Sequence, residues 1–394
     1  MKIKSISFGS LVFAVYSVTI LAFIFLPNLQ YSIKYVHLLI MSFPLVVWVC
    51  IGKDKIINIF ACLVLMVLFQ IFFNFSGNIT ASINTSLLLY LCLIGYIVFE
   101  GSQKVGSRIT LTIIIISALV MMGIVAFNTY NEFSRNPTVA RLLARGGNDN
   151  EEVNWLRSMN IGGYGFSYAV GMLIPYVATW IIRAKGGKKW ISILLFVALI
   201  VYAFKTQYTT LLLLSTIFSG YVFFACYKTM HAKIAVFVVV LFLIFGLRPI
   251  FEYLADITKL ETLSLHFKDI AKMLAGEQSD SSRSELQWYA FELFIKNPLF
   301  GADLTNAENA YIVGHAHSTF ASALGSYGMF GILLYYGSFM LAMKNVKKMV
   351  PTFRFIKPVF MHFVVLSFFN PITTFEIFAV TFLVIPGLEL LLNY

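Results

Sequence analysis

The residues whose types and spacing best suit chemistry begin at position 282. Ser282 and Glu285 have the spacing of a capping box, in which Ser282 is the N-cap of a helix. Apolar residues then recur at helical spacing until Pro298 ends the segment. The predicted helix carries Arg283 in its first turn, where unpaired N–H groups and an arginine fork favour a phosphate-like anion. The alternative is an ion pair between Arg283 and Asp280 or another surface carboxylate.

Two histidines follow at positions 315 and 317. Residues i and i+2 do not share a helix face, and no cysteine or His-Glu-x-x-His pattern lies nearby, so a metal site is not predicted. Imidazole titrates near neutral pH, so either ring could act as a general base. The alternative is a histidine at a membrane interface whose ring is hydrogen-bonded. Gly325, Gly328 and Gly331 then recur every three residues and predict a small-residue packing face between helices.

The composition indicates the environment of these residues. The 394-residue chain is 59% hydrophobic and only 12% charged, whereas soluble domains carry roughly 25% charged residues. Its net charge of +11 comes from basic residues in loops between apolar segments, which favours membrane orientation over nucleic-acid binding. All four cysteines lie in or beside apolar segments without paired spacing, so neither a disulfide framework nor a zinc site is predicted.

Apolar runs of about 20 residues, the length that crosses a bilayer, recur along the whole chain. They predict one all-α integral membrane domain over residues 1–394, with about twelve transmembrane helices. The predicted spans are 5–27, 35–51, 56–74, 81–99, 109–128, 161–183, 188–204, 207–227, 232–248, 316–343, 355–372 and 374–393.

Basic residues predict the orientation of these spans. Six loops on the side of the N-terminus hold 17 of the 29 Lys and Arg residues, while the short loops opposite hold only Lys34 and Lys205. The positive-inside rule therefore places both termini in the cytoplasm. Two longer polar segments, about 129–160 and 249–315, fall on the outer side. Loops of this length in a compact protein are usually functional or disordered, and the helical periodicity of the second favours function.

Several of these features together resemble the O-antigen polymerase and O-antigen ligase superfamily. The resemblance is carried by the run Arg283 to Trp288, by Asn297–Gly301, by His317–Phe320 and by Gly328–Gly331. In that family, an arginine precedes an amphipathic periplasmic helix ending in a Pro-x-x-Gly turn, and a histidine then opens a helix carrying Gly-x-x-Gly. The stretch Asn160–Gly165 before the sixth predicted span is similar as well.

The resemblance implies a glycosyltransferase at the periplasmic face of the bacterial inner membrane. Its donor would be a glycan linked through pyrophosphate to undecaprenol, and its acceptor a sugar hydroxyl on a second lipid-linked repeat unit. It implies catalytic roles for Arg283, which would hold the pyrophosphate, and for His317, which would be the general base of an inverting transfer. We expect no cofactor and no required metal, since no acidic cluster suggests Mg²⁺. A protein that regulates chain length would be an additional partner.

Other residues are candidates for substrate binding. The family usually has Asn where this chain has Ser318, often has Glu at the position of Ser326, and often has Arg near the eighth span, where Lys205 could supply the charge. Periplasmic arginines contact glycan or pyrophosphate in the family. The substrate-binding candidates are therefore Lys205, Arg141, Arg145, Arg157, His315 and Ser318.

Two alternatives remain open from the sequence. Within the superfamily, a ligase would transfer the finished glycan to lipid A core. From another class, a flippase or transporter of lipid-linked oligosaccharides would also have many spans. A transporter should carry charged residues at the membrane midplane, whereas the predicted spans here are nearly free of them.

Overall fold

A computed structural model describes residues 7–32, 56–75, 77, 79–105, 108–136, 138–145, 150–226, 252–257, 264–265, 267–268, 271 and 282–392. This part of the chain is helical and contains no β-strand. The α-helices are α1 (Phe8–Phe25), α2 (Pro27–Ser32), α4 (Ile56–Phe69), α5 (Ile79–Val105), α6 (Arg108–Glu132), α7 (Val139–Arg145), α8 (Glu151–Ser158), α9 (Tyr164–Arg183), α10 (Gly187–Lys205), α11 (Thr209–Cys226), α14 (Ser282–Lys296), α15 (Ala307–His315), α16 (Thr319–Met349), α17 (Lys357–Phe369), α18 (Phe375–Ala379) and α19 (Ile385–Leu392). A π-helical segment, η1 (Gln70–Asn74), extends α4, η2 (Phe353–Phe355) is a 3₁₀ turn, and η3 (Val380–Val384) joins α18 to α19.

Six helices in the described part are long and apolar enough to cross a membrane: Phe8–Phe25, Arg108–Glu132, Tyr164–Arg183, Gly187–Lys205, Thr319–Met349 and Phe375–Leu392. Shorter apolar helices cover Val64–Asn74, Thr209–Ala225 and Lys357–Phe369. The chain is therefore an all-α membrane protein, as its composition predicts. The predicted spans at 35–51 and 232–248 lie outside the described residues, so the number of twelve stays a prediction.

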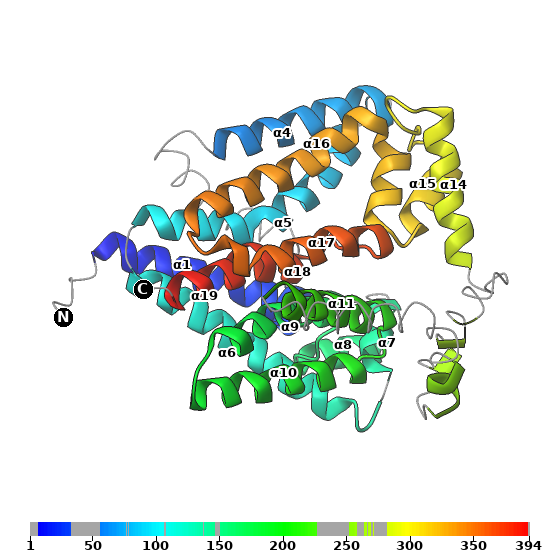
Figure 1. Cartoon of the computed structure of the whole chain (residues 1–394). Coiled ribbons are helices and arrows are strands. Elements are labelled where there is room, and N and C mark those ends of the chain that lie inside the picture. The colour runs from blue at the N-terminus through cyan, green and yellow to red at the C-terminus, as the bar shows by residue number, and fades with distance from the viewer. Residues whose placement is uncertain are drawn as a thin grey trace.

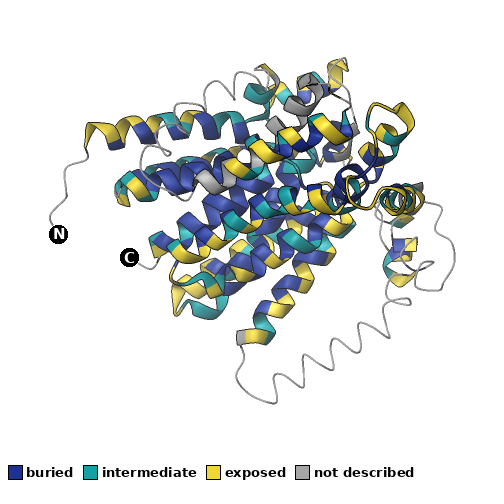
Figure 2. Ribbon diagram, turned by 90° about the horizontal axis from the view of Figure 1, so that it is seen from above, coloured by how far each residue is buried: buried dark blue, intermediate teal, exposed yellow. Residues whose placement is uncertain are grey.

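The helix α9 lies near the centre of the bundle, and α10 lies at its edge. Of the 18 residues in the apolar stretch of α9, 72% are buried, whereas 17% are buried in the corresponding stretch of α10. The α9 helix packs against α10, α11, α17 and α18, and Figure 2 shows buried residues concentrated inside the bundle and exposed ones outside. The α10 residues Trp190 and Leu194 are about 70% exposed, as expected for side chains that face lipid.

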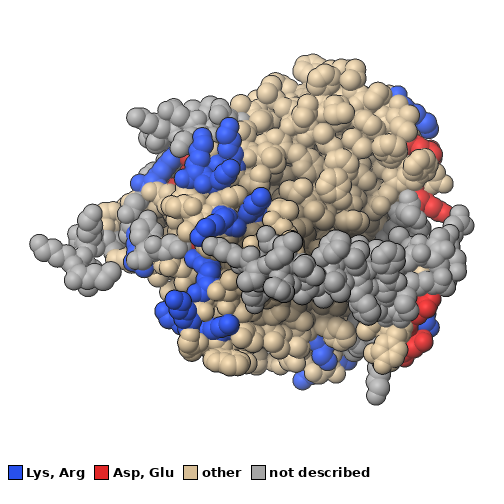
Figure 3. Space-filling view, viewed as in Figure 1, with Lys and Arg blue, Asp and Glu red and all other residues tan. Residues whose placement is uncertain are grey.

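The two ends of the bundle differ in charge and in the segments that they carry. Figure 3 shows Lys and Arg gathered at the end where both termini lie in Figure 1, and acidic residues at the opposite end. The basic end holds Lys104, Arg108, Arg183, Lys185, Lys188, Lys189, Lys344, Lys347, Lys348, Arg354 and Lys357. The opposite end carries α7, α8, α14 and α15, which belong to the two long polar segments (Figure 1). We call it the loop-bearing end.

Two buried acidic residues lie close to the basic end, and each has a cationic partner. Glu389 of α19 is fully buried and accepts hydrogen bonds from Arg183 at 2.8 Å and from the Tyr176 hydroxyl at 3.0 Å. Glu100 of α5 is 4% exposed and lies 3.5 Å from Lys104. Because burying an unpaired charge is costly, each of these buried acids is accompanied by a basic residue.

A break at Gly328 divides α16 into two straight segments. Gly328 has φ 59° and ψ −163°, a conformation open essentially only to glycine. The segment Met329–Met349, roughly 20 residues and long enough to cross a bilayer, packs along α4. The segment 319–327 turns away from it and lies beside α14 and α15 (Figure 1). The predicted span at 316–343 therefore overlaps a helix that bends at Gly328, a break that hydropathy does not reveal.

The turn after α14 fits into this break. The backbone N–H of Met329 donates to the carbonyl of Pro298 at 2.8 Å, and the N–H of Phe330 donates to that of Leu299 at 3.1 Å. Gly301, with φ 78°, lies so close that a Cβ there would be 2.3 Å from the Ser326 carbonyl oxygen. The Pro-x-x-Gly turn and the Gly-x-x-Gly sequence are therefore two halves of one contact.

Asn74, the last residue of η1, ties a third element to this contact. It is fully buried. Its side-chain amide donates to the carbonyl oxygens of Ser326 at 2.7 Å and Phe300 at 3.0 Å, and its own carbonyl accepts from the Leu304 N–H at 2.8 Å. We call Asn74, residues 297–304 and the break at Gly328 the hinge junction.

Gly328→Ala should destabilise the protein. A Cβ at position 328 would lie 2.6 Å from the backbone N of Gly301 and from the backbone C of Leu299, and alanine would have to hold a glycine-only conformation at a cost of roughly 1–3 kcal/mol. We expect a lower melting temperature for the full-length protein in detergent. Gly337→Ala, in the same helix with open space around its Cα, is the control and should melt like the wild type. Equal melting temperatures for both variants would contradict the role of the hinge junction.

Candidate functional site

Three helix ends converge at the loop-bearing end. The helices α14, α15 and the first segment of α16 pack side by side (Figure 1). The α14 and α16 backbones touch where Gly325 faces Ala290, since a Cβ at 325 would lie 2.7 Å from the Ala290 carbonyl oxygen. Together with the Leu299–Phe330 hydrogen bond, this contact shows that the two helices run parallel. The N-termini of α14 and α16 and the C-terminus of α15 therefore lie at one end of the three-helix unit.

This parallel packing sets Arg283 level with the start of α16. Arg283 lies seven residues before Ala290, and Thr319 lies six residues before Gly325. Because an α-helix rises 1.5 Å per residue, both positions lie about 10 Å from the Gly325–Ala290 contact, toward the N-termini of the two helices. The α14 helix begins at Ser282, one residue before the position that the capping-box pattern predicts, and ends at Lys296 as predicted. The backbone of Arg283 is thus in the first turn, while its side chain lies outside the described part.

His317 occupies the sharp bend that leads into α16. It has φ 51°, the left-handed conformation uncommon for residues other than glycine, and its side chain is exposed. The next residue, Ser318, is buried and caps α16 by accepting the Ala321 N–H at 3.1 Å. Its hydroxyl also donates to the Ser367 carbonyl at 3.3 Å. The structure therefore gives Ser318 a structural role and presents His317 at the surface of the site.

His315 has a different environment. It is the last residue of α15, its ring stacks on Tyr311 at 4.2 Å between centroids, and its Nδ1 lies 2.9 Å from the Tyr311 carbonyl oxygen.

In the loop before α15, the Thr305 N–H and hydroxyl hydrogen-bond to Asp303 and lower the pKa of that carboxyl. Asp303 is therefore ionised near neutral pH and is not a proton donor there.

An extended segment, 370–374, joins the three-helix unit to the rest of the bundle. The Asn370 carbonyl accepts from the Thr319 N–H at 3.3 Å, and the Thr319 hydroxyl accepts from the Ile372 N–H at 2.7 Å. On its other side, the Tyr164 hydroxyl donates to the Pro371 carbonyl at 2.9 Å. This segment therefore fixes the start of α16 relative to the start of α9.

Aromatic contacts extend from Tyr164 toward the first long segment. Its ring packs on Tyr168 at 4.6 Å and on Tyr208 at 5.5 Å, and the Tyr208 hydroxyl donates to the Ala140 carbonyl of α7 at 2.8 Å. Ala140 directly precedes Arg141, and Tyr208 follows Lys205 by three residues, so both lie near predicted substrate-binding residues. Tyr164 belongs to the stretch Asn160–Gly165 that resembles the family, whereas the sequence did not single out Tyr168 and Tyr208, since aromatic residues are common throughout the chain.

The predicted binding residues fall into two groups. Arg283, His315 and His317 lie on the three-helix unit. The other group surrounds α9: the helices α7 and α10 pack against α9, and α8 packs against α7. Its members are Arg141 and Arg145 on α7, whose side chains lie outside the described part, Arg157 in the last turn of α8, and the exposed Lys205 at the end of α10.

A cavity of about 360 Å³ opens beside the start of α16. Hydroxyl groups line one part of it and apolar side chains the rest, as in many ligand pockets. Its lining residues include Thr319, Ser322, Ser326, Tyr327, Leu304 and Pro371. Among the described residues, no group of three or more His, Cys, Asp or Glu could hold a metal ion.

Comparison with known proteins adds no relative, since neither a protein-family profile nor a curated protein matches this sequence.

We expect His317 and His315 to differ under mutation. If His317 has the general-base role that the family resemblance implies, His317→Ala should abolish polymer formation, because loss of a general base typically costs about 10²–10⁴-fold in rate, while the protein still accumulates in the membrane. His315→Ala, the matched control, should retain most of the activity, since that ring rests on its own helix. A gel of surface glycan from cells carrying each variant checks this. Equal tolerance of both changes would remove the general-base assignment.

Proposed function

We propose that this protein is a membrane glycosyltransferase that polymerises O-antigen or a similar surface polysaccharide. It works at the periplasmic face of a bacterial inner membrane, with both termini in the cytoplasm. The donor is a glycan on undecaprenyl pyrophosphate, and the acceptor is a sugar hydroxyl of another lipid-linked repeat unit. The observation that carries the proposal is the parallel packing of α14 and α16, which sets Arg283 level with the bend that holds His317.

The arrangement suits displacement of a pyrophosphate. The acceptor hydroxyl oxygen attacks the anomeric carbon as the bond from that carbon to the pyrophosphate oxygen breaks, which inverts the configuration. His317 accepts the hydroxyl proton. The leaving pyrophosphate takes the bonding electrons, and the N–H groups of the first turn of α14 with Arg283 stabilise its charge. These groups can perform the transfer without a metal, and we propose that the enzyme needs none.

The distribution of charge supports an enzyme over a flippase. A transporter of charged lipids is expected to hold ionisable residues at the membrane midplane. Here the buried acids Glu100 and Glu389 lie near the C-terminal ends of their helices and are paired with Lys104 and Arg183. Glu376 lies in the first turn of α18, where Gln30 donates to it at 3.2 Å. His362 in α17 is fully buried beside Phe218, 5.2 Å between ring centroids, and neither of its nitrogens has a hydrogen-bond partner among the described residues. An uncharged ring suits that position.

Arg283→Lys should lower activity by at least about tenfold, because lysine keeps the charge but loses the planar fork that binds two phosphate oxygens. Lys296→Ala, at the other end of the same helix, is the control and should leave activity unchanged. The measurement is the rate of polymer formation by purified protein from lipid-linked repeat units. Full activity in Arg283→Lys and Arg283→Ala would show that this arginine does not bind the pyrophosphate and only forms a surface ion pair.

Deletion of the gene tests the function itself. A polymerase joins units before transfer, so its loss should leave lipid A core with at most one repeat unit, and the intact gene should restore the ladder. The measurement is a lipopolysaccharide gel together with analysis of undecaprenyl-linked glycans. Bare core with long undecaprenyl-linked chains would indicate the ligase. Bare core with single units trapped at the cytoplasmic face would indicate the flippase, and an unchanged ladder would contradict all three.

A further inference from the structure

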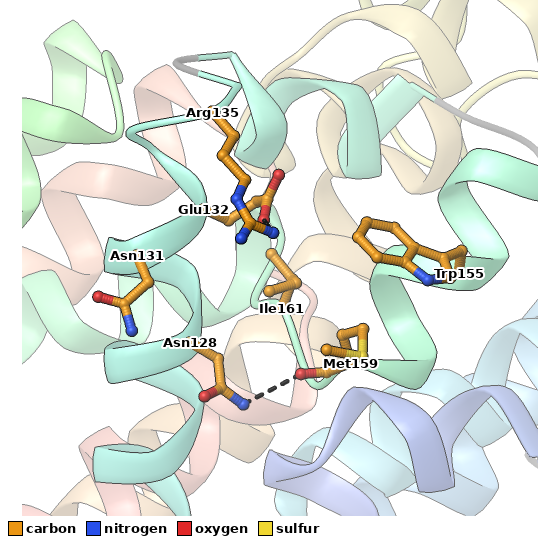
Figure 4. Close-up of a pocket in the computed structure, with 7 residues that line it drawn as sticks. All are labelled: Asn128, Asn131, Glu132, Arg135, Trp155, Met159 and Ile161. Atoms are coloured by element: carbon orange, nitrogen blue, oxygen red, sulfur yellow. Dashed lines mark hydrogen bonds and ion pairs between the residues drawn. The ribbon is translucent and has the colours of Figure 1, made fainter.

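A second pocket lies at the loop-bearing end, between the end of α6 and α8. Its volume is about 360 Å³, within the range of small-molecule sites. One wall comes from α6 and the turn after it, the other from α8 and the residues that follow (Figure 4). The lining residues are Asn128, Asn131, Glu132, Arg135, Trp155, Met159 and Ile161. Only Ile161 lies in a stretch that the family resemblance points to, and none of them is a predicted catalytic or binding residue.

Hydrogen bonds fix the two walls relative to each other. The Asn128 side-chain amide donates to the Met159 carbonyl at 3.0 Å, drawn in Figure 4. Next to this bond, the Gly162 N–H donates to the buried Thr129 hydroxyl at 2.7 Å. Because both bonds join α6 to the segment after α8, the pocket is formed before any ligand arrives, which lowers the entropy lost on binding.

The aromatic wall is a half-exposed tryptophan. The α8 helix buries Val153 and Leu156 on its inner face, whereas Trp155 is 50% exposed. A tryptophan that only anchored a membrane interface would need no polar groups opposite it. Here Figure 4 shows its ring across the pocket from Glu132 and Arg135. The ring therefore offers an apolar face within reach of hydrogen-bonding groups.

The polar wall carries no net charge. The Arg135 guanidinium lies 4.0 Å from the Glu132 carboxylate, with side-chain exposures of 78% and 12%. The pair supplies donors from the guanidinium and acceptors from the carboxylate. An anionic ligand would gain little here, because Glu132 would repel it. An uncharged ligand with many hydroxyl groups and an apolar face suits both walls.

We propose that this pocket binds a neutral sugar residue, stacked on Trp155 and hydrogen-bonded to Arg135 and Glu132. Sugar rings present C–H groups on one face and hydroxyls at their edge, which match an aromatic ring and a donor–acceptor pair. The assignment rests on the proposed function for the source of the sugar, which is the lipid-linked glycan. The three-helix unit then acts on the pyrophosphate and this pocket holds a sugar of the chain.

The test uses full-length protein in lipid nanodiscs and, as the probe, oligosaccharides released by mild acid from the surface polysaccharide of the source strain. Binding is measured by saturation-transfer NMR and titration. Trp155→Ala should weaken binding by about tenfold or more, the size expected when an aromatic contact is lost, and Trp155→Phe should recover most of it. Trp190→Ala removes an exposed tryptophan at the opposite end and should bind like the wild type.

Unchanged binding in Trp155→Ala would overturn the sugar site, as would failure of the wild type to bind any released oligosaccharide. A lower melting temperature or poorer membrane insertion of Trp155→Ala with unchanged affinity would identify a membrane anchor and overturn it too. None of these results bears on polymerisation, which the gene deletion described above tests separately. Binding lost in Trp155→Ala while deletion leaves the ladder unchanged would keep the sugar site and reject the polymerase.

Discussion

The position of the whole candidate site depends on one contact between backbones, the hinge junction. At Gly328 the chain bends where a side chain cannot fit, and the freed N–H groups of Met329 and Phe330 are satisfied by the turn after α14. Buried backbone donors without partners are costly, so the bend and the turn stabilise each other. Asn74 adds hydrogen bonds from the end of α4. Together with the backbone contact of Gly325 with Ala290, this junction fixes α14 parallel to the first segment of α16.

A second constraint comes from the cost of charge in hydrocarbon. The basic residues lie at one end of the bundle and the long polar segments at the other. The buried acids Glu100 and Glu389 are paired with basic residues near the basic end, and the other buried polar side chains of the described bundle are hydroxyl and amide groups together with His362. Polar chemistry is thereby confined to the loop-bearing end, where water and lipid headgroups can solvate charged substrates.

The loop-bearing end contains two environments that differ in charge. The three-helix unit combines a helix N-terminus with Arg283 and the histidines, which favours an anion. The pocket between α6 and α8 holds an ion pair opposite an indole ring and favours a neutral ligand. Segment 370–374 and the tyrosines around Tyr164 lie between the three-helix unit and α7. A glycan-bearing lipid carries both kinds of group, a charged linkage and uncharged sugars.

The sequence by itself determined the class of protein and most helix positions, because apolar runs of membrane length and loops of one charge are local properties of the chain. It also determined the end of α14 at Lys296, since Pro298 cannot continue a helix. The tertiary structure decided the break at Gly328, the role of Asn74 and the pocket at Trp155. Each of these depends on residues distant in sequence that share hydrogen bonds or a surface, and no periodicity records such pairings. Ser318 shows the difference: its place in the family pattern suggested substrate binding, and the structure shows that its hydroxyl caps α16.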